Sequence, residues 1–73
     1  MSVEKKKPVP ERNENGQYHI TAKFCCEISE YNGYYSSPGL IYNLFLHFKG
    51  FSKIENLDSF ANVRVLYLEN NCI

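Results

Sequence analysis

The sequence IYNLFLHFKGF (residues 41–51) is followed 22 residues later by VRVLYLENNCI (residues 63–73), and the apolar positions of the two segments coincide. Between the two segments, further apolar side chains follow at intervals of three. The repeated and connecting positions are Ile41, Leu44, Leu46, Phe51, Ile54, Leu57, Phe60, Val63, Leu66, Leu68 and Ile73. Self-similarity at a fixed period of this length is typical of repeat architectures, in which each unit buries its apolar face against its neighbour.

This spacing matches the 22-residue leucine-rich repeat, and each part of the pattern has a physical reason. Leucines two residues apart, such as Leu44 and Leu46, place their side chains on the same face of a strand. Asn71 stands at the asparagine position of the repeat, where its amide can satisfy backbone groups exposed by a turn. The positions spaced three apart predict a 3₁₀-like or short helical return. We therefore predict an α/β fold that begins a leucine-rich-repeat solenoid.

The segments before the repeat contain a polar tail and a short helix. Thr21 can cap a helix whose apolar positions reach Tyr31, and the Asn-Gly pair that follows is a stop signal. The first 18 residues show no periodicity, and their lysine run, residues 5–7, is assigned no function. The predicted organisation is a disordered tail (1–18), a capping helix and turn (19–40), a first repeat (41–62) and an incomplete second repeat (63–73).

One long amphipathic helix over residues 40–60 is the alternative to the repeat. Gly50 lies in the middle of this segment and disfavours a helix there. The alternation of Leu44, Phe45 and Leu46 also fits the period of a strand better than that of a helix. The repeat is therefore the preferred interpretation.

Composition argues against several classes of function. Eight basic and eight acidic side chains give a net charge of zero, so no general attraction to nucleic acid or to an anionic membrane is expected. The longest apolar stretch, residues 40–48, is about half of the ~20 residues that a membrane-spanning helix needs. Three cysteines, two of them adjacent at Cys25 and Cys26, fit a reducing compartment. We find no pattern for a cofactor, a metal or a catalytic site and expect no enzymatic activity.

In a parallel pair of strands with this offset, the side chains between the leucines project outward together. The concave face of the solenoid, where such proteins usually bind partners, would carry Asn43, Phe45, His47, Val65, Tyr67 and Glu69. Phe45 beside Tyr67 is either a binding hot spot or a cross-strand pair that only stiffens the sheet. His47 beside Glu69 is either a pH-sensitive contact or a plain surface pair. These four residues are the candidate partner-binding positions.

The segments LFLHFKGFSKIENL (residues 44–57) and VLYLENN (residues 65–71) closely resemble the first repeats of the axonemal dynein assembly factor 1 family, also called leucine-rich repeat-containing protein 50. The similarity covers residues 20–73. It implies a cytoplasmic factor of ciliated or flagellated cells that is needed to assemble dynein arms. Dynein subunits, chaperones or other assembly factors are the implied partners. Members of the family continue with further repeats and a cap, so the resemblance indicates an N-terminal fragment.

Two other functions remain open: a generic repeat adaptor, of the phosphatase-regulator or microtubule-associated type, and a nonfunctional truncated product. A chain of 73 residues builds only a small core, and a solenoid usually needs about three repeats with capped ends. Leu66, Leu68 and Ile73 are expected to face water at the unfinished end. We therefore expect that the isolated chain does not persist as a stable monomer.

Overall fold

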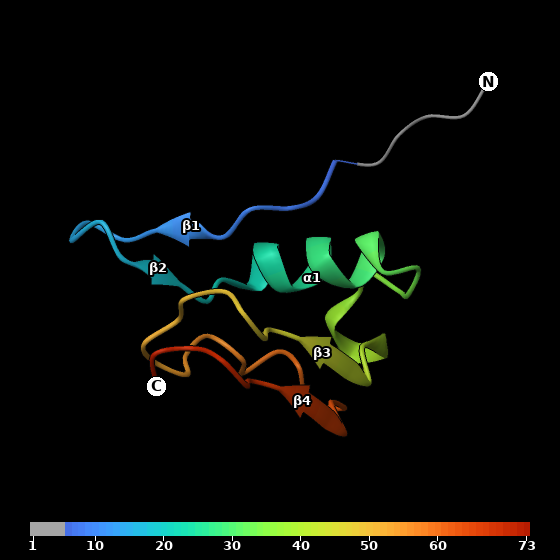
Figure 1. Ribbon diagram of the computed structural model, residues 1–73. Helices are drawn as coiled ribbons and strands as arrows, with labels where there is room; N and C mark the ends of the chain where they lie inside the picture. The colour runs from blue at the N-terminus through green and yellow to red at the C-terminus, as the bar shows by residue number, and fades with distance from the viewer. Residues whose placement is uncertain (1–5) are drawn as a thin grey trace.

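The computed structural model describes residues 6–73 as a small mixed α/β fold with one α-helix and short strands (Figure 1). The elements in chain order are β1 (Glu11–Arg12), β2 (Tyr18–His19), α1 (Ala22–Tyr31), the 3₁₀ helix η1 (Pro38–Leu40), β3 (Asn43–Phe45) and β4 (Val65–Tyr67). β1 pairs with β2 and β3 pairs with β4, so the strands form two separate sheets. Helix α1 packs against β3.

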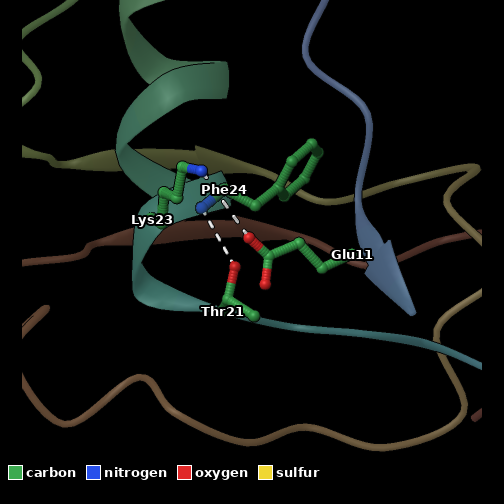
Figure 2. A network of polar contacts seen from close by, with 4 residues as sticks. All are labelled: Glu11, Thr21, Lys23 and Phe24. Atoms are coloured by element: carbon green, nitrogen blue, oxygen red, sulfur yellow. Dashed lines mark hydrogen bonds and ion pairs between the residues drawn. The ribbon is translucent and has the colours of Figure 1, made fainter. Parts of the chain in front are cut away.

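Helix α1 begins and ends where the sequence predicts. The side-chain hydroxyl of Thr21 accepts a hydrogen bond of 3.1 Å from the backbone N–H of Phe24, which satisfies one of the free donors of the first turn (Figure 2). Asn32 caps the other end, and Gly33 follows with a φ of 85°, which glycine adopts without steric strain. The buried face of the helix carries Phe24, Cys25, Ile28 and Ser29. The predicted helix is confirmed.

Replacing Thr21 by alanine removes this cap and is expected to lower the free energy of unfolding by about 1 kcal/mol. Thr21→Ser keeps a hydroxyl group at the same position and is the matched control. Urea unfolding followed by circular dichroism compares the two variants at one fixed protein concentration. Equal losses of stability in the serine and alanine variants would contradict a capping role for the hydroxyl.

The disordered tail predicted over residues 1–18 needs a correction. Residues 1–5 lie outside the described part of the chain, and residues 6–10 carry no helix or strand. β1 and β2 then pair antiparallel and form a short hairpin. The predicted disorder is therefore wrong from residue 11 onward.

Polar contacts hold this hairpin together, and Tyr18 also packs against the hydrophobic core. The guanidinium group of Arg12 lies 4.5 Å from the centre of the Tyr18 ring and donates to the tyrosine hydroxyl at 3.0 Å. The side chain of Asn13 accepts hydrogen bonds from two backbone N–H groups of the turn. An ion pair of 3.8 Å between Lys23 and Glu11 joins β1 to α1 (Figure 2), although both side chains are largely exposed and add little stability.

β3 and β4 form a parallel pair with the predicted offset of 22 residues. Leu44 stands beside Leu66, and Phe45 stands beside Tyr67. The ladder continues past the strand ends, where the backbone N–H of Leu46 donates to the Tyr67 carbonyl at 3.0 Å. The chain between the two strands therefore makes one coil that returns beside its own start (Figure 1).

The core lies between helix α1 and this coil. Phe24 of the helix meets Phe51 of the coil edge to face, with ring centres 6.0 Å apart. The buried residues are Ile20, Phe24, Cys25, Ile28, Ile41, Leu44, Leu46, Phe51 and Phe60. The helix therefore covers one side of the coil and shields its apolar interior from water.

The return segment differs from the predicted 3₁₀-like or short helical return. Residues 52–59, all within the described part, form bends and turns and contain no helix. Asn56 adopts a φ of 60°, and its side-chain amide donates to the backbone carbonyl of Ile20 at 2.8 Å. Ile54 is 49% exposed instead of buried, and Leu57 is half-buried, so the predicted period of three does not hold throughout this segment.

Asn71 holds the turn after β3 through four hydrogen bonds. Its Oδ1 atom accepts from the backbone N–H groups of Lys49 at 3.0 Å and Phe51 at 3.1 Å. Its Nδ2 atom donates to the carbonyls of Leu46 at 2.7 Å and Leu68 at 2.9 Å. The side chain thereby satisfies backbone groups that would otherwise have no partner as the chain leaves the ladder.

The far side of the coil, which α1 does not cover, has exposed apolar side chains. Leu66 is 38% exposed and Ile73 is 62% exposed, whereas Leu68 is half-buried against the core. A shallow groove of about 260 Å³ on this side is lined by Leu44, Leu57, Phe60, Val63, Arg64 and Leu66. We refer to this groove and strand β4 together as the open side.

Candidate functional site

Aromatic side chains gather on the outward face of β3 and β4. The rings of Phe45 and Tyr67 are stacked, with centres 5.0 Å apart and an angle of 7° between their planes. Tyr34 packs on Phe45 at 5.7 Å, and His47 meets Tyr67 edge to face at 6.0 Å. We call this surface the aromatic face and define it as Tyr34, Phe45, His47, Phe48 and Tyr67. Strand alternation accounts for Phe45, His47 and Tyr67, since the leucines between these residues point inward.

Two members of the aromatic face have no counterpart in the sequence prediction. Tyr34 reaches Phe45 because the chain bends back after α1, where the backbone N–H of Tyr34 donates to the Ser29 carbonyl at 3.0 Å. Phe48 adopts a φ of 55° and contacts the ring of His47 at 5.7 Å. Neither bend follows a periodic pattern, so no signal in the sequence assigned these two residues to the face.

His47 and Glu69 are neighbours in register but make no ion pair with each other in the described part of the chain. The Glu69 carbonyl accepts a backbone hydrogen bond of 3.1 Å from Phe48. The Nδ1 atom of His47 is buried and has no hydrogen-bond partner among the described residues. The imidazole therefore contributes mainly through its ring contacts with the aromatic face.

A groove of about 170 Å³ adjoins the aromatic face on the side of helix α1. It is lined by Lys7, Ile28, Tyr31, Asn32, Phe45, His47 and Lys49, and we call it the lysine groove. Burial, and secondly the charge of nearby Lys7, lower the pKa of the Lys49 ammonium group below its ordinary value. Both effects disfavour the charged form of Lys49.

The buried cysteine Cys25 supplies little reactive chemistry. Burial, and secondly the neighbouring Cys26, raise the pKa of the Cys25 thiol to about 12. The thiolate is the reactive form of cysteine, so Cys25 is a poor nucleophile near neutral pH. Within residues 6–73, no group of three or more histidine, cysteine or acidic side chains could hold a metal ion. Within the same residues, no helix has the length and apolar character needed to cross a membrane.

The sequence was compared with known proteins, and one relative indicates the class of protein to which this chain is similar. No family model and no solved structure matches the chain. The leucine-rich repeat-containing protein ODA7 of Chlamydomonas reinhardtii is 35% identical over 54 residues, which is 74% of this chain and 12% of that protein. The chain is thus similar to a protein named for its leucine-rich repeats.

Other relatives share one family name. Dynein axonemal assembly factor 1 of Rattus norvegicus is 38% identical over 58 residues, which is 80% of this chain and 9% of that protein. Its homolog in Drosophila pseudoobscura pseudoobscura is 40% identical over 58 residues, again 80% of this chain but 4% of the relative. The resemblance to the dynein axonemal assembly factor 1 family is therefore confirmed. The matched region spans at most 12% of the length of these three relatives.

Proposed function

We propose that this chain is part of a non-enzymatic leucine-rich-repeat protein that acts in the assembly of axonemal dynein arms. The observation that carries the proposal is the similarity, over 80% of the chain, to relatives named dynein axonemal assembly factor 1. The relatives come from insects and mammals, and an algal relative is named for leucine-rich repeats. Assembly requires binding of other proteins, and this chain offers an aromatic face for that purpose.

The repeat assignment of the fold is part of the same proposal. Residues 19–40 serve as the N-terminal cap, residues 41–62 as the first repeat and residues 63–73 as the start of the second. The parallel register of β3 and β4 and the four hydrogen bonds of Asn71 support this assignment. In a solenoid, the surface built by successive strands is the usual place for a partner.

We propose that the aromatic face is this docking surface. Phe45 and Tyr67 form its centre, and His47 and Glu69 form its border. Stacked rings present a large and rigid apolar area, and aromatic residues are enriched among interface hot spots for this reason. The proposed partners are dynein subunits, chaperones or other assembly factors, which would be met in the cytoplasm before the arms reach the cilium or flagellum.

The double substitution Phe45→Ala and Tyr67→Ala, made in the gene that encodes this chain, tests the proposal in ciliated or flagellated cells. Truncation of a central hot-spot residue typically costs about 2 kcal/mol or more, which is about 30-fold in affinity. We therefore expect axonemes to lack most of their dynein arms. Electron microscopy of axoneme cross-sections measures this loss directly.

Tyr35→Ala is the matched control, because Tyr35 is 64% exposed and lies outside the aromatic face. Circular dichroism of the purified variants checks that the fold is retained. Normal dynein arms in the double variant would contradict the docking role of the aromatic face. Normal arms in cells that lack the gene would contradict the assembly function itself and favour a generic adaptor of the phosphatase-regulator or microtubule-associated type.

A further inference from the structure

The lysine groove concentrates positive charge beside the aromatic face. Its ionisable lining groups are Lys7, Lys49, His47 and the phenol of Tyr31, and none of them is a carboxylate. Two ion pairs occur elsewhere in the described part of the chain, between Lys23 and Glu11 and between Lys53 and Glu55, but neither lysine of the groove takes part in one. No carboxylate lines this groove, so it is a cationic site, although Lys7 also lines a larger neighbouring pocket with Glu27 and Glu30.

The position of Lys49 is set by the fold. Its backbone N–H donates to Asn71 Oδ1 at 3.0 Å, which holds the residue at the turn after β3. Its side chain is half-buried and lies close enough to Lys7 for the two charges to repel each other. An anion placed between the two ammonium groups would relieve this repulsion and favour the charged form of both.

The groove and the aromatic face share Phe45 and His47, so one extended segment could occupy both. The groove, with a volume of about 170 Å³, is large enough for a carboxylate side chain. The neighbouring stack of Phe45 and Tyr67 offers a flat apolar surface for an adjacent side chain. Nucleic acid is disfavoured, because the chain has a net charge of zero and Glu69 borders the same face.

We propose that the partner segment bound by this surface is an acidic peptide, with a carboxylate in the lysine groove and a neighbouring aromatic side chain on Phe45 and Tyr67. This inference rests on the proposed docking role of the aromatic face and names the chemistry of its partner. It also gives a function to Lys7, which belongs to the lysine run of residues 5–7. The segment before the hairpin thereby contributes to the same binding surface as β3.

Two labelled probe peptides test the inference on the full chain, tethered sparsely to a sensor surface through its C-terminus so that copies cannot associate. One peptide carries a phenylalanine flanked by glutamates, and the other has glutamines in place of the glutamates. We expect the acidic peptide to bind about tenfold more tightly at low salt, and we expect this preference to shrink as salt is added.

Lys49→Gln is expected to reduce the preference for the acidic peptide to about threefold, and Lys7→Gln together with Lys49→Gln is expected to abolish it. Lys53→Gln is the matched control, because Lys53 is exposed and is paired with Glu55 outside the groove. This control is expected to keep the full preference. The amide side chain preserves most of the length of lysine, and the Asn71 contact uses only the backbone of residue 49.

Three outcomes would overturn the inference. Equal affinity for the acidic and neutral peptides would remove the acidic preference but leave the aromatic docking surface standing. Competition by inorganic phosphate as strong as that by the unlabelled acidic peptide would indicate a plain anion site. Failure of both peptides to bind, with the same result for the Lys53→Gln control, would contradict the proposed docking surface as well.

Discussion

Asn71→Ala is expected to leave the coil largely unfolded. The substitution leaves the backbone N–H groups of Lys49 and Phe51 without an acceptor. It also leaves the carbonyls of Leu46 and Leu68 without this donor. An unsatisfied buried polar group costs about 1–3 kcal/mol of stability. The Asn71 site is half-buried, so water can satisfy part of the four exposed backbone groups. We therefore expect the free energy of unfolding to fall by about 3 kcal/mol in total.

A loss of this size is comparable with the whole stability expected of so small a domain, which is a few kcal/mol. Circular dichroism during urea unfolding at one fixed protein concentration measures the loss. Asn62→Ala is the control, because Asn62 is exposed and makes one side-chain hydrogen bond, to the Gly39 carbonyl at 2.8 Å. Similar unfolding midpoints for the two variants would contradict the structural role of Asn71.

The purified 73-residue chain is expected to self-associate through its open side. Strand β4 pairs with β3 on one edge only, so the backbone groups of Leu66 point away from the ladder and can pair with another chain. Val65, Leu66 and Ile73 are 42%, 38% and 62% exposed. Full burial of a wholly exposed side chain of this kind is worth roughly 1.5–3 kcal/mol. Covering the exposed parts of these three side chains is therefore worth a few kcal/mol together, which is comparable with the stability of the monomer.

Sedimentation velocity over a range of protein concentrations measures this association. We expect Leu66→Lys together with Ile73→Lys to shift the chain toward the monomer, because a charge at an edge strand opposes pairing. Ile54→Lys is the control, since Ile54 is 49% exposed on the return segment and does not line the open-side groove. A monodisperse unmodified monomer with a cooperative thermal transition would show that the core between α1 and the coil is sufficient without a partner.

Helix α1 and the pairing of β3 with β4 could be predicted from the sequence because their determinants are local and repeated. The Thr21 hydroxyl accepts from the backbone N–H of Phe24, three residues later, so this helix-capping signal is contained in one turn of sequence. The recurrence of leucines at Leu44 and Leu66 sets the register of the sheet, since a slip of one residue would turn every side chain to the opposite face. Asn71 was identified for the same reason, by its place in a repeated pattern.

The exposed Ile54 and the membership of the aromatic face were decided only by the tertiary structure. The Asn56 side chain donates to the Ile20 carbonyl across 36 residues of sequence, and this contact joins the return segment to the chain before α1. Phe48 occupies the left-handed region of backbone conformation, which a bulky residue rarely adopts and which no periodicity indicates.

The lysine groove illustrates the same division between sequence and structure. Phe45 and His47 were placed on one face by strand alternation, which the sequence alone determined. Lys7 and Lys49 are 42 residues apart in the sequence and yet line one groove. The chain before the hairpin runs beside helix α1 (Figure 1). Contacts between segments so distant in sequence depend on how the elements pack, and packing is a property of the whole core rather than of any local pattern.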